Sequence, residues 1–568
     1  MCDSRASRCQ DSQIMRAVRK ISECERPVHQ RSARPSVLAE SMAGKEGRRR
    51  VAVVGSGVAG VCAAESALRQ DSDCEVALIS PSAGAKRVEN VQPLSRTIET
   101  FDVVERPLDC LCRDVPLFKQ RLIPYLTSAK LVDTSNSTLH LTDGSHLSYD
   151  ALIWCAGAQP KQISGSEDAP PDRVITLRDS DSVRELAHRL GSARSIGIIG
   201  NGGIALELAG ALRGARHQVL WLAKHRNIGD AFLDQDAAHF LAKRAGLTNC
   251  SPNDNPNTWR ASGEQERDMH STQSTLSGKK RKDRKAHGSQ NGSSASHCDA
   301  KQQQGVPAGA VGPDWVKLLS GVVSTDDAED GSNIAVELEE EAVFLQCNDD
   351  QSSSPVTVTM ASGKQHRMDV CVFAAGVVPN TEPLAQCQGA HVDDEDGGIL
   401  VNSCMQAVGL EDKCVYVAGD ACTCSWAKDW NESPHWFQMR LWTQARTLGA
   451  FAGACAVGAA DELAMGYNLE VFAHTTRFLG EDVILLGRYN AQKMDDVDQG
   501  RLMSYCREVE RNQFVRITTL DGRAIGSVLI GDTGLAETME NLIMNRIDVS
   551  QFGAELLDPE IDLEDYFD

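Results

Sequence analysis

"VAVVGSGVAGVCAAESAL" spans residues 51–68 and joins an apolar run, a turn with three glycines and an Ala-rich segment. The apolar run predicts a buried strand and the Ala-rich segment predicts a helix. Gly55 permits a tight turn, Gly57 lets the backbone approach a pyrophosphate, and Gly60 lets the helix pack closely on the strand. The first turn of the helix offers free N–H groups and the positive end of its dipole to phosphates. The stretch therefore predicts a dinucleotide-binding unit.

Composition excludes several other classes of protein. The chain has 568 residues, 41% of them hydrophobic, which is enough for several globular domains. A formal charge of −21 argues against direct, non-specific binding of nucleic acid. No run is long enough and apolar enough to cross a bilayer, so we expect no membrane partner. The 19 cysteines are scattered and form no C-x-x-C pair, so we expect reduced intracellular thiols and no metal site.

A second strand, glycine turn and helix appear in "SIGIIGNGGIALELAGAL" (195–212). Two further segments, "YDALIWCAGAQP" (149–160) and "MDVCVFAAGVVPN" (368–380), each end a strand with Ala-Gly and then Pro. In "DKCVYVAGDACT" (412–423) another apolar strand ends at Gly419-Asp420. This arrangement resembles the flavoprotein reductases that have two dinucleotide-binding domains. The resemblance implies an α/β fold with two Rossmann-like domains, the FAD domain interrupted by the NAD(P)H domain, and a C-terminal α+β domain.

The expected domain limits follow from these segments and from composition. They are a disordered N-terminal extension at 1–47, FAD-binding residues 48–185, an NAD(P)H-binding domain at 190–365 with a disordered insertion at 250–310, further FAD-binding residues 366–458, an α+β interface domain at 459–550 and an acidic tail at 551–568.

The resemblance also implies roles for individual residues. Asp420 would hydrogen-bond the ribityl chain of FAD, and Glu207 would lie near nicotinamide and flavin, unless it is an exposed helix carboxylate. Lys86 would approach the flavin and pair with Glu207, or remain solvated. Trp442 begins a predicted helix and would be a flavin or nicotinamide platform, or part of the core. The glycine-turn and strand-end residues that would hold FAD are Gly55, Gly57, Gly60, Ala156, Gly157 and Gly419, and those that would hold NAD(P)H are Gly200, Gly202 and, in place of a third glycine, Ala205.

Two strand ends depart from the usual pattern, in which an acid binds the adenosine ribose. The strand "CEVALIS" (74–80) ends in Ser80, whose hydroxyl replaces a bidentate carboxylate with a single hydrogen bond. The strand "HQVLWLAKHR" (217–226) ends in Lys224, His225 and Arg226. These basic residues would receive the 2′-phosphate of NADPH or remain solvated, so either nicotinamide cofactor is allowed.

The cysteine pairs that disulfide reductases of this class require are absent from the sequence. Neither C-x-x-x-x-C near the first helix nor C-x-x-C in the second unit occurs, and "AKRVENVQPLSRTIETFDV" (85–103) contains no cysteine. Reduced flavin in those enzymes passes its electrons to such a disulfide. We therefore expect no thiol relay.

The motifs "IIGNGGIALEL", "GPDW" (312–315), "MRLWTQAR" (439–446) and "LLDPEIDLEDYFD" (556–568) resemble the eukaryotic pyridine nucleotide-disulfide oxidoreductase domain-containing protein 1 family. That resemblance implies an FAD-containing NAD(P)H oxidoreductase of cytoplasm and nucleus that associates with the tRNA ligase complex and protects it from oxidation. An alternative is an electron-transfer reductase for an iron–sulfur protein or another protein acceptor. The oligomeric state stays open.

The acidic tail is a candidate contact with the ligase complex. Its carboxylates would mimic an RNA backbone or offer oxygen ligands to a divalent metal, or they would merely keep the chain soluble. The tail residues concerned are Asp558, Glu560, Asp562, Glu564, Asp565 and Asp568.

Overall fold

The first sheet is parallel, and its central strands are short apolar runs that are almost entirely buried, whereas the edge strand at residues 122–126 is partly exposed. The computed structural model describes residues 48–165, 173–177, 180–249, 315–320, 333–347, 355–460, 469–509 and 512–558. The strand order is β22-β9-β1-β2-β5. The bounds are β1 Arg49–Val54, β2 Cys74–Ser80, β5 Leu122–Leu126, β9 Ala151–Trp154 and β22 Val415–Val417. Continuous apolar runs of this kind are typical of parallel strands that are covered on both faces.

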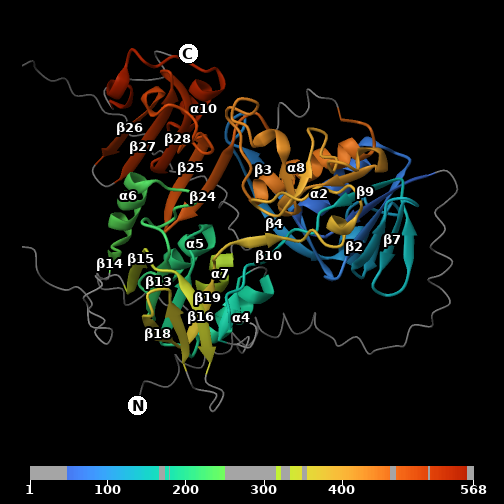
Figure 1. The fold of residues 1–568 in the computed structure, drawn as a ribbon, viewed down its shortest axis with the longest axis horizontal. Coiled ribbons are helices and arrows are strands. Elements are labelled where there is room, and N and C mark those ends of the chain that lie inside the picture. The colour runs from blue at the N-terminus through green and yellow to red at the C-terminus, as the bar shows by residue number, and fades with distance from the viewer. Residues whose placement is uncertain are drawn as a thin grey trace, which may run out of the picture. The chain divides into compact units, whose positions relative to one another are not determined.

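Two helices far apart in the sequence lie side by side against this sheet (Figure 1). They are α2 (Val58–Gln70) and α8 (Trp442–Ala456). A Cβ on Gly449 would overlap the carbonyl oxygen of Ala59, and a Cβ on Gly453 would overlap that of Ala63. The two glycines therefore let the helix backbones touch.

Three small sheets accompany the first sheet. Two are antiparallel, namely β3 (Gly84–Pro93) with β4 (Glu99–Pro107), and β6 (Ala129–Asp133) with β7 (Thr138–Leu141) and β8 (His146–Ser148). The third is a parallel pair of β21 (Ile399–Val401) and β23 (Cys422–Cys424). The helix α3 (Leu108–Asp114) follows β4, and the short 3₁₀ turns are η1 Leu384–Gln386, η2 Glu411–Lys413, η3 Gly419–Ala421 and η4 Ser425–Ala427.

The second sheet has the order β11-β19-β12-β13-β15-β14 and is parallel in every pair. Its strands are β11 Val174–Thr176, β12 Ser195–Ile199, β13 Gln218–Ala223, β14 Thr248–Asn249, β15 Ile334–Leu338 and β19 Val370–Phe373. The helices of this part are α4 Ser180–Leu190, α5 Gly203–Leu212, α6 Gln235–Ala245 and α7 Trp315–Ser320. A three-stranded antiparallel sheet of β16 (Ala342–Cys347), β17 (Val356–Met360) and β18 (Gln365–Met368) adjoins it.

The chain passes between the two parallel sheets through one antiparallel ribbon. Its strands are β10 (Ala158–Pro160) and β20 (Val377–Pro379), with Ala158 opposite Pro379. The structure therefore corrects two predicted limits, because β11 lies before 185 and β19 lies after 366, yet both belong to the second sheet. The change of sheet occurs at the ribbon instead.

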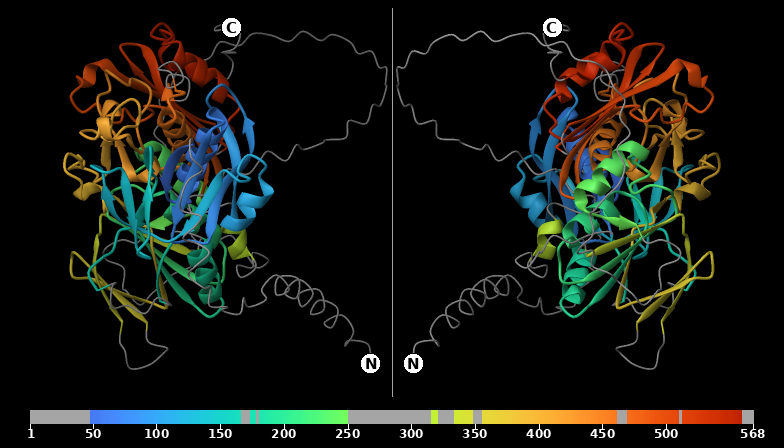
Figure 2. Two further views of the ribbon diagram at one scale, coloured as in Figure 1. Left: turned by 90° about the vertical axis from the view of Figure 1, so that its right-hand side faces the viewer. Right: turned by 90° about the vertical axis from the view of Figure 1, so that its left-hand side faces the viewer.

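The third sheet is antiparallel, with the order β24-β25-β28-β27-β26, and is drawn in red and orange in Figure 2. Its elements are β24 Ala473–Phe478, β25 Glu481–Gly487, η5 Gln499–Arg501, β26 Leu502–Val509, β27 Gln513–Leu520, β28 Arg523–Gly531, α10 Ala536–Met544 and η6 Gly553–Leu557. α10 packs on β25 and β28. The expected fold class, two Rossmann-like domains and a C-terminal α+β domain, is confirmed.

No helix in the described ranges is both long enough and apolar enough to span a membrane. Within the same ranges, no three His, Cys, Asp or Glu side chains gather in a way that could hold a metal ion. The extension 1–47, the insertion 250–310 and all the tail residues after Asp558 lie outside the described residues.

Candidate functional site

The first glycine turn has the geometry of a phosphate cradle. Gly55 has a φ of +111°, and a Cβ there would overlap the carbonyl oxygen of Cys155. A Cβ on Gly60 would overlap the carbonyl oxygen of Gly55. At Gly57, by contrast, a Cβ would meet no atom within 4 Å, and no side chain caps α2. Two glycines thus close the turn, and the third leaves open space at an uncapped helix N-terminus, which fits a pyrophosphate.

The second turn repeats this division of roles. Gly200 has a φ of +132°, and a Cβ on it would overlap the carbonyl oxygen of Ala374. Gly202 is the N-cap residue of α5, no side chain caps the helix, and a Cβ on Gly202 would meet nothing within 4 Å. Ala205, at the third-glycine position, is fully buried. This turn therefore also fits a dinucleotide phosphate.

Ser80 lies at the end of β2, but its hydroxyl is already in use. The residue is 3% exposed, and its Oγ lies 2.8 Å from the Oγ of Ser56. Ser56 donates to the carbonyl oxygen of Gly84 at 2.8 Å, so Ser80 must be the donor to Ser56, and Ser80 accepts from the N–H of Ser82 at 3.1 Å. These bonds tie the first glycine turn to β2, and the contact of Ser80 with a ribose stays a prediction that requires this network to exchange.

Ala156, Gly157 and Gly419 follow strands of the first sheet, and close contacts hold their backbone in place. Asn380 Nδ2 donates to the carbonyl oxygen of Ala156 at 3.0 Å, and the Asn380 N–H donates to that of Gly157 at 2.9 Å. Gly419 has a φ of +72°, and a Cβ on it would lie 2.7 Å from the Cβ of Ala59 on α2. Asn380 ends the segment 368–380, and its bonds to residues 156 and 157 could not be predicted because those residues are distant in the sequence.

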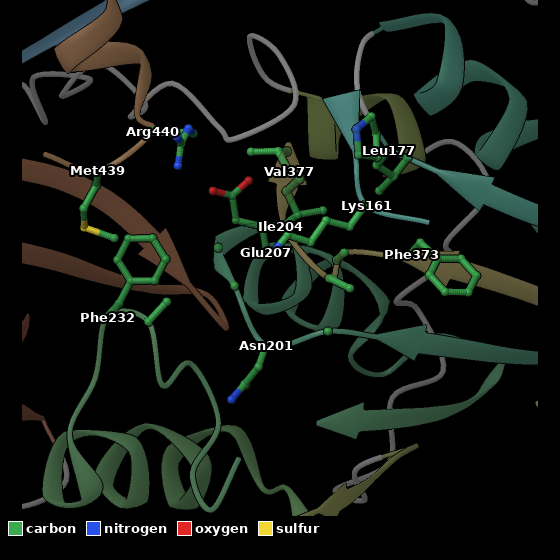
Figure 3. Close-up of a pocket in the computed structure, with 18 of the residues that line it drawn as sticks. Lys161, Leu177, Asn201, Ile204, Glu207, Phe232, Phe373, Val377, Met439 and Arg440 are labelled. Atoms are coloured by element: carbon green, nitrogen blue, oxygen red, sulfur yellow. The ribbon is translucent and has the colours of Figure 1, made fainter. Parts of the chain in front are cut away.

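A cavity of about 710 Å³ connects the second turn with the N-terminus of α8. Of the predicted residues, Gly200, Gly202, Glu207, Lys224, Asp420 and Trp442 line it. Figure 3 shows the Glu207 carboxylate pointing into the cavity, with Arg440 and Met439 to one side of it. Lys161, Leu177 and Phe373 lie toward the other end. A pocket of this size, which extends from the second glycine turn to Asp420 and the start of α8, is large enough to hold part of a bound cofactor.

Glu207 is held by a residue that the sequence analysis assigned no role. The indole Nε1 of Trp315 donates to Glu207 Oε2 at 2.6 Å. Glu207 is 8% exposed and Trp315 is 1% exposed, so the bond is shielded from bulk water. Trp315 begins α7, which packs on α4 and α5. The tryptophan of "GPDW" was the available signal, but its partner lies 108 positions earlier.

Charged groups surround Asp420, which lines the cavity. Burial raises the pKa of the Asp420 carboxyl, and the charges of Arg440 and Lys86 oppose that effect. Arg440 Nε donates to the Asp420 carbonyl oxygen at 3.1 Å. Lys86 Nζ lies 5.1 Å from the centre of the Trp442 ring, a cation–π distance. The structure therefore brings Lys86, Asp420 and Trp442 together, while the pairing of Lys86 with Glu207 stays a prediction.

His474 enters the cavity from β24 of the third sheet. Its ring stacks on Phe232, with the centres 5.9 Å apart and the planes inclined by 28°. The Nδ1 atom is buried and has no hydrogen-bond partner. Burial lowers the pKa of His474 from 6.5 to about 4, so the imidazole is neutral at pH 7. A neutral ring with an unused nitrogen offers a hydrogen bond to a ligand in the cavity.

Comparison with known proteins gives consistent results. A family model described as pyridine nucleotide-disulphide oxidoreductase matches residues 49–249 and 326–449. The chain is 34% identical over 538 residues to the human pyridine nucleotide-disulfide oxidoreductase domain-containing protein 1, covering 91% of this chain and 97% of the relative. The relative of that name in Dictyostelium discoideum is 32% identical, with 91% and 99% covered.

Solved structures show the same fold at low sequence identity. A ferredoxin reductase from Rhodopseudomonas palustris is similar with a TM-score of 0.61 and 15% identity, covering 92% of this chain and 100% of that one. The water-forming NADH oxidase of Lactobacillus brevis gives a TM-score of 0.57 and 14% identity, with 91% and 94% covered. FAD and NAD(P)H are the cofactors of the matched family, and the two glycine turns fit them.

Proposed function

The chain belongs to the pyridine nucleotide-disulphide oxidoreductase family, and on that premise we propose that it is an FAD-dependent NAD(P)H oxidoreductase that works without an internal redox disulfide. When bound, FAD would accept hydride from NAD(P)H and pass electrons on to oxygen or to a protein. The main support for the proposal is the continuous cavity that extends from the second glycine turn to Asp420 and the start of α8. Within the described part of the chain, no cysteine lines that cavity.

The two glycine turns and the cavity have distinct tasks in this proposal. The first turn would hold the FAD diphosphate at Gly57, and the second would hold the NAD(P)H diphosphate at Gly202. The N-terminus of α8 directs partial positive charge toward the cavity, which favours negative charge on a bound ring system. Trp315 holds the Glu207 carboxylate in place, and the Phe232–His474 stack closes part of the cavity wall.

The visible absorption spectrum of the purified protein tests the redox proposal. We expect a flavin band that bleaches after one equivalent of NADH or NADPH in the absence of oxygen, and its rate of return in air shows whether oxygen is an acceptor. Asp420→Ala should lower flavin content, whereas Asp412→Asn, an exposed aspartate outside the cavity, should not. A yellow Asp420→Ala protein with full flavin content would contradict the role of Asp420. A flavin that neither nucleotide reduces would contradict the redox function.

We further propose that the protein acts in cytoplasm and nucleus by associating, in an NAD(P)H-dependent manner, with the tRNA ligase complex and protecting its catalytic subunit from oxidation. This proposal is supported by the resemblance of the four motifs and by the acidic tail. Its test is a truncation that spares the fold. Leu556 and Leu557 are buried and the carbonyl oxygen of Leu557 accepts from Arg507, so the cut belongs after Asp558.

Removal of residues 559–568 should leave flavin reduction intact and weaken capture of the ligase complex. A matched variant replaces Tyr566 and Phe567 by Ser, which keeps the charge of the tail. If both variants bind the complex as the parent does, the tail is not the contact. If NAD(P)H makes no difference to binding of the parent, the nucleotide dependence is wrong.

A second candidate is electron transfer to an iron–sulfur protein. It is favoured by a cavity without cysteines among the described residues and by the likeness of the fold to that of a ferredoxin reductase. The assay is reduction of cytochrome c that depends on added ferredoxin. A rate independent of ferredoxin over a panel of such proteins would exclude this candidate.

A further inference from the structure

The strand β13 ends without the acid that usually binds the adenosine ribose of NAD, but the structure supplies acids from another element. Residues 339–341, between β15 and β16, are three consecutive glutamates. The N–H of Glu339 donates to the carbonyl oxygen of His225 at 3.1 Å, and that of Glu340 donates to Ala223 at 3.4 Å. Glu339 adopts a φ of +61°, the left-handed conformation of a tight turn. The backbone therefore fixes this acidic turn against the end of β13.

Each basic residue at the end of β13 has an acidic partner. Lys224 Nζ lies 3.7 Å from Glu341 Oε1, and Arg226 Nε lies 3.1 Å from Glu339 Oε1. His225 Nδ1 lies 3.5 Å from Asp230 Oδ2. These pairs are exposed, and such pairs contribute little individually. What matters for a cofactor is the net charge that these side chains place at the cavity wall.

Only part of this group faces the cavity. Lys224, His225, Asp230, Glu340 and Glu341 line it, while Arg226 and Glu339 do not. This group thus contributes three carboxylates and, apart from histidine, one cation to the cavity wall. A 2′-phosphate brings a charge of about −1.5 to −2 at pH 7, and the carboxylates would repel it. A free ribose hydroxyl instead donates hydrogen bonds to carboxylates, as the strand-end acid does in other dinucleotide sites.

We propose that Glu340 and Glu341 determine cofactor specificity and make this site selective for NADH over NADPH. This proposal rests on the proposed function, because it assumes that the second turn binds the nicotinamide cofactor. It also favours one of the two alternatives raised by the sequence, because Lys224 and Arg226 are paired with glutamates of the acidic turn.

Binding of adenosine fragments tests the proposal without any redox readout. The probes are 5′-AMP and 2′,5′-ADP, titrated by calorimetry into the FAD-loaded protein, together with the dissociation constants of NADH and NADPH. We expect 5′-AMP and NADH to bind about tenfold more tightly or better than their phosphorylated counterparts at low salt, with a smaller difference at high salt. In the double variant Glu340→Gln/Glu341→Gln this ratio should fall by about tenfold, mainly through tighter binding of 2′,5′-ADP and NADPH.

The control removes the same two charges elsewhere. Asp394→Asn/Asp412→Asn changes two exposed aspartates outside the cavity and should keep the ratio of the parent. Equal or tighter binding of 2′,5′-ADP by the parent would overturn the proposal, and so would an unchanged ratio in the glutamate variant. If the fragments show the expected preference but neither NADH nor NADPH reduces the flavin, the specificity stands and the redox function fails.

Discussion

Replacement of Gly57 by Ala tests whether this glycine is needed for binding the FAD pyrophosphate or only for folding of the turn. Gly57 has a φ of −69° and a ψ of −177°, which an alanine adopts without strain, and its Cβ would meet no atom within 4 Å. The free energy of unfolding of the FAD-depleted protein should therefore stay the same or rise by about 0.5 kcal/mol, because alanine restricts the unfolded chain.

The effect on FAD should be the opposite. Phosphate oxygens must come within about 2.9 Å of backbone N–H groups to be bound. A methyl group in that space keeps the pyrophosphate away and removes at least one charged hydrogen bond of about 1.5–3 kcal/mol. The dissociation constant of FAD should therefore rise by about tenfold to a hundredfold.

Two measurements check this reasoning, namely urea unfolding and quenching of flavin fluorescence on titration of the FAD-depleted protein. Gly500→Ala is the matched control, since the nearest atom to its Cβ would be a side-chain oxygen at 3.5 Å and it lies in the third sheet region. Gly60→Ala should instead destabilise the protein itself, because its Cβ overlaps the turn. Unchanged FAD affinity in Gly57→Ala would refute the cradle, and a clear loss of stability would refute the reading of the space as open.

Three further predictions follow from packing, hydrogen bonding and burial. Trp315→Phe removes the hydrogen-bond donor to a buried carboxylate and should lower the free energy of unfolding in urea by about 1.5–3 kcal/mol. The control Trp154→Phe loses a hydrogen bond to the neutral carbonyl of Asn380 and should lower it by about 1 kcal/mol. Equal losses in the two variants would contradict this prediction. Gly453→Ala forces α8 away from α2 and should cost about 1–3 kcal/mol in calorimetric unfolding, and an unchanged melting temperature would contradict the close approach. Burial lowers the pKa of His474 from 6.5 to about 4, so the unfolded chain binds more protons between these values and stability falls as pH falls through that window. His474→Phe should weaken this pH dependence of unfolding, with a remainder from His435, whose pKa is also lowered to about 4 by burial, and an unaltered slope would show that His474 does not contribute.

The local geometry of the glycine turns could be predicted from the sequence, whereas contacts between distant segments could not. The turn at Gly55, Gly57 and Gly60 is local, because strand, turn and helix follow one another and each glycine has its own steric reason. The hydrogen bond from Trp315 to Glu207 could not be predicted, because the two residues are 108 positions apart in the sequence. The position of residues 340 and 341 beside the end of β13 could not be predicted either, because it depends on hydrogen bonds between segments more than a hundred residues apart.

Two of the predicted domain limits were wrong for a different reason. β11 and β19 are short apolar strands, and hydrophobic pattern does not tell which of two parallel sheets such a strand will join. Only the pairing of β10 with β20 reveals where the chain changes sheets. The hydroxyl of Ser80 shows a similar limit, because its bond to Ser56 depends on the exact approach of the turn to the strand end.

The β10–β20 ribbon marks both ends of the chain segment that carries the second sheet, which we call the cassette. Pro160 lies opposite Val377, so the entry and exit of this cassette are neighbours in space. A short turn joining those two residues would reconnect the first sheet without stretching it. The pairing therefore marks these two residues as the junctions at which to exchange this segment between relatives.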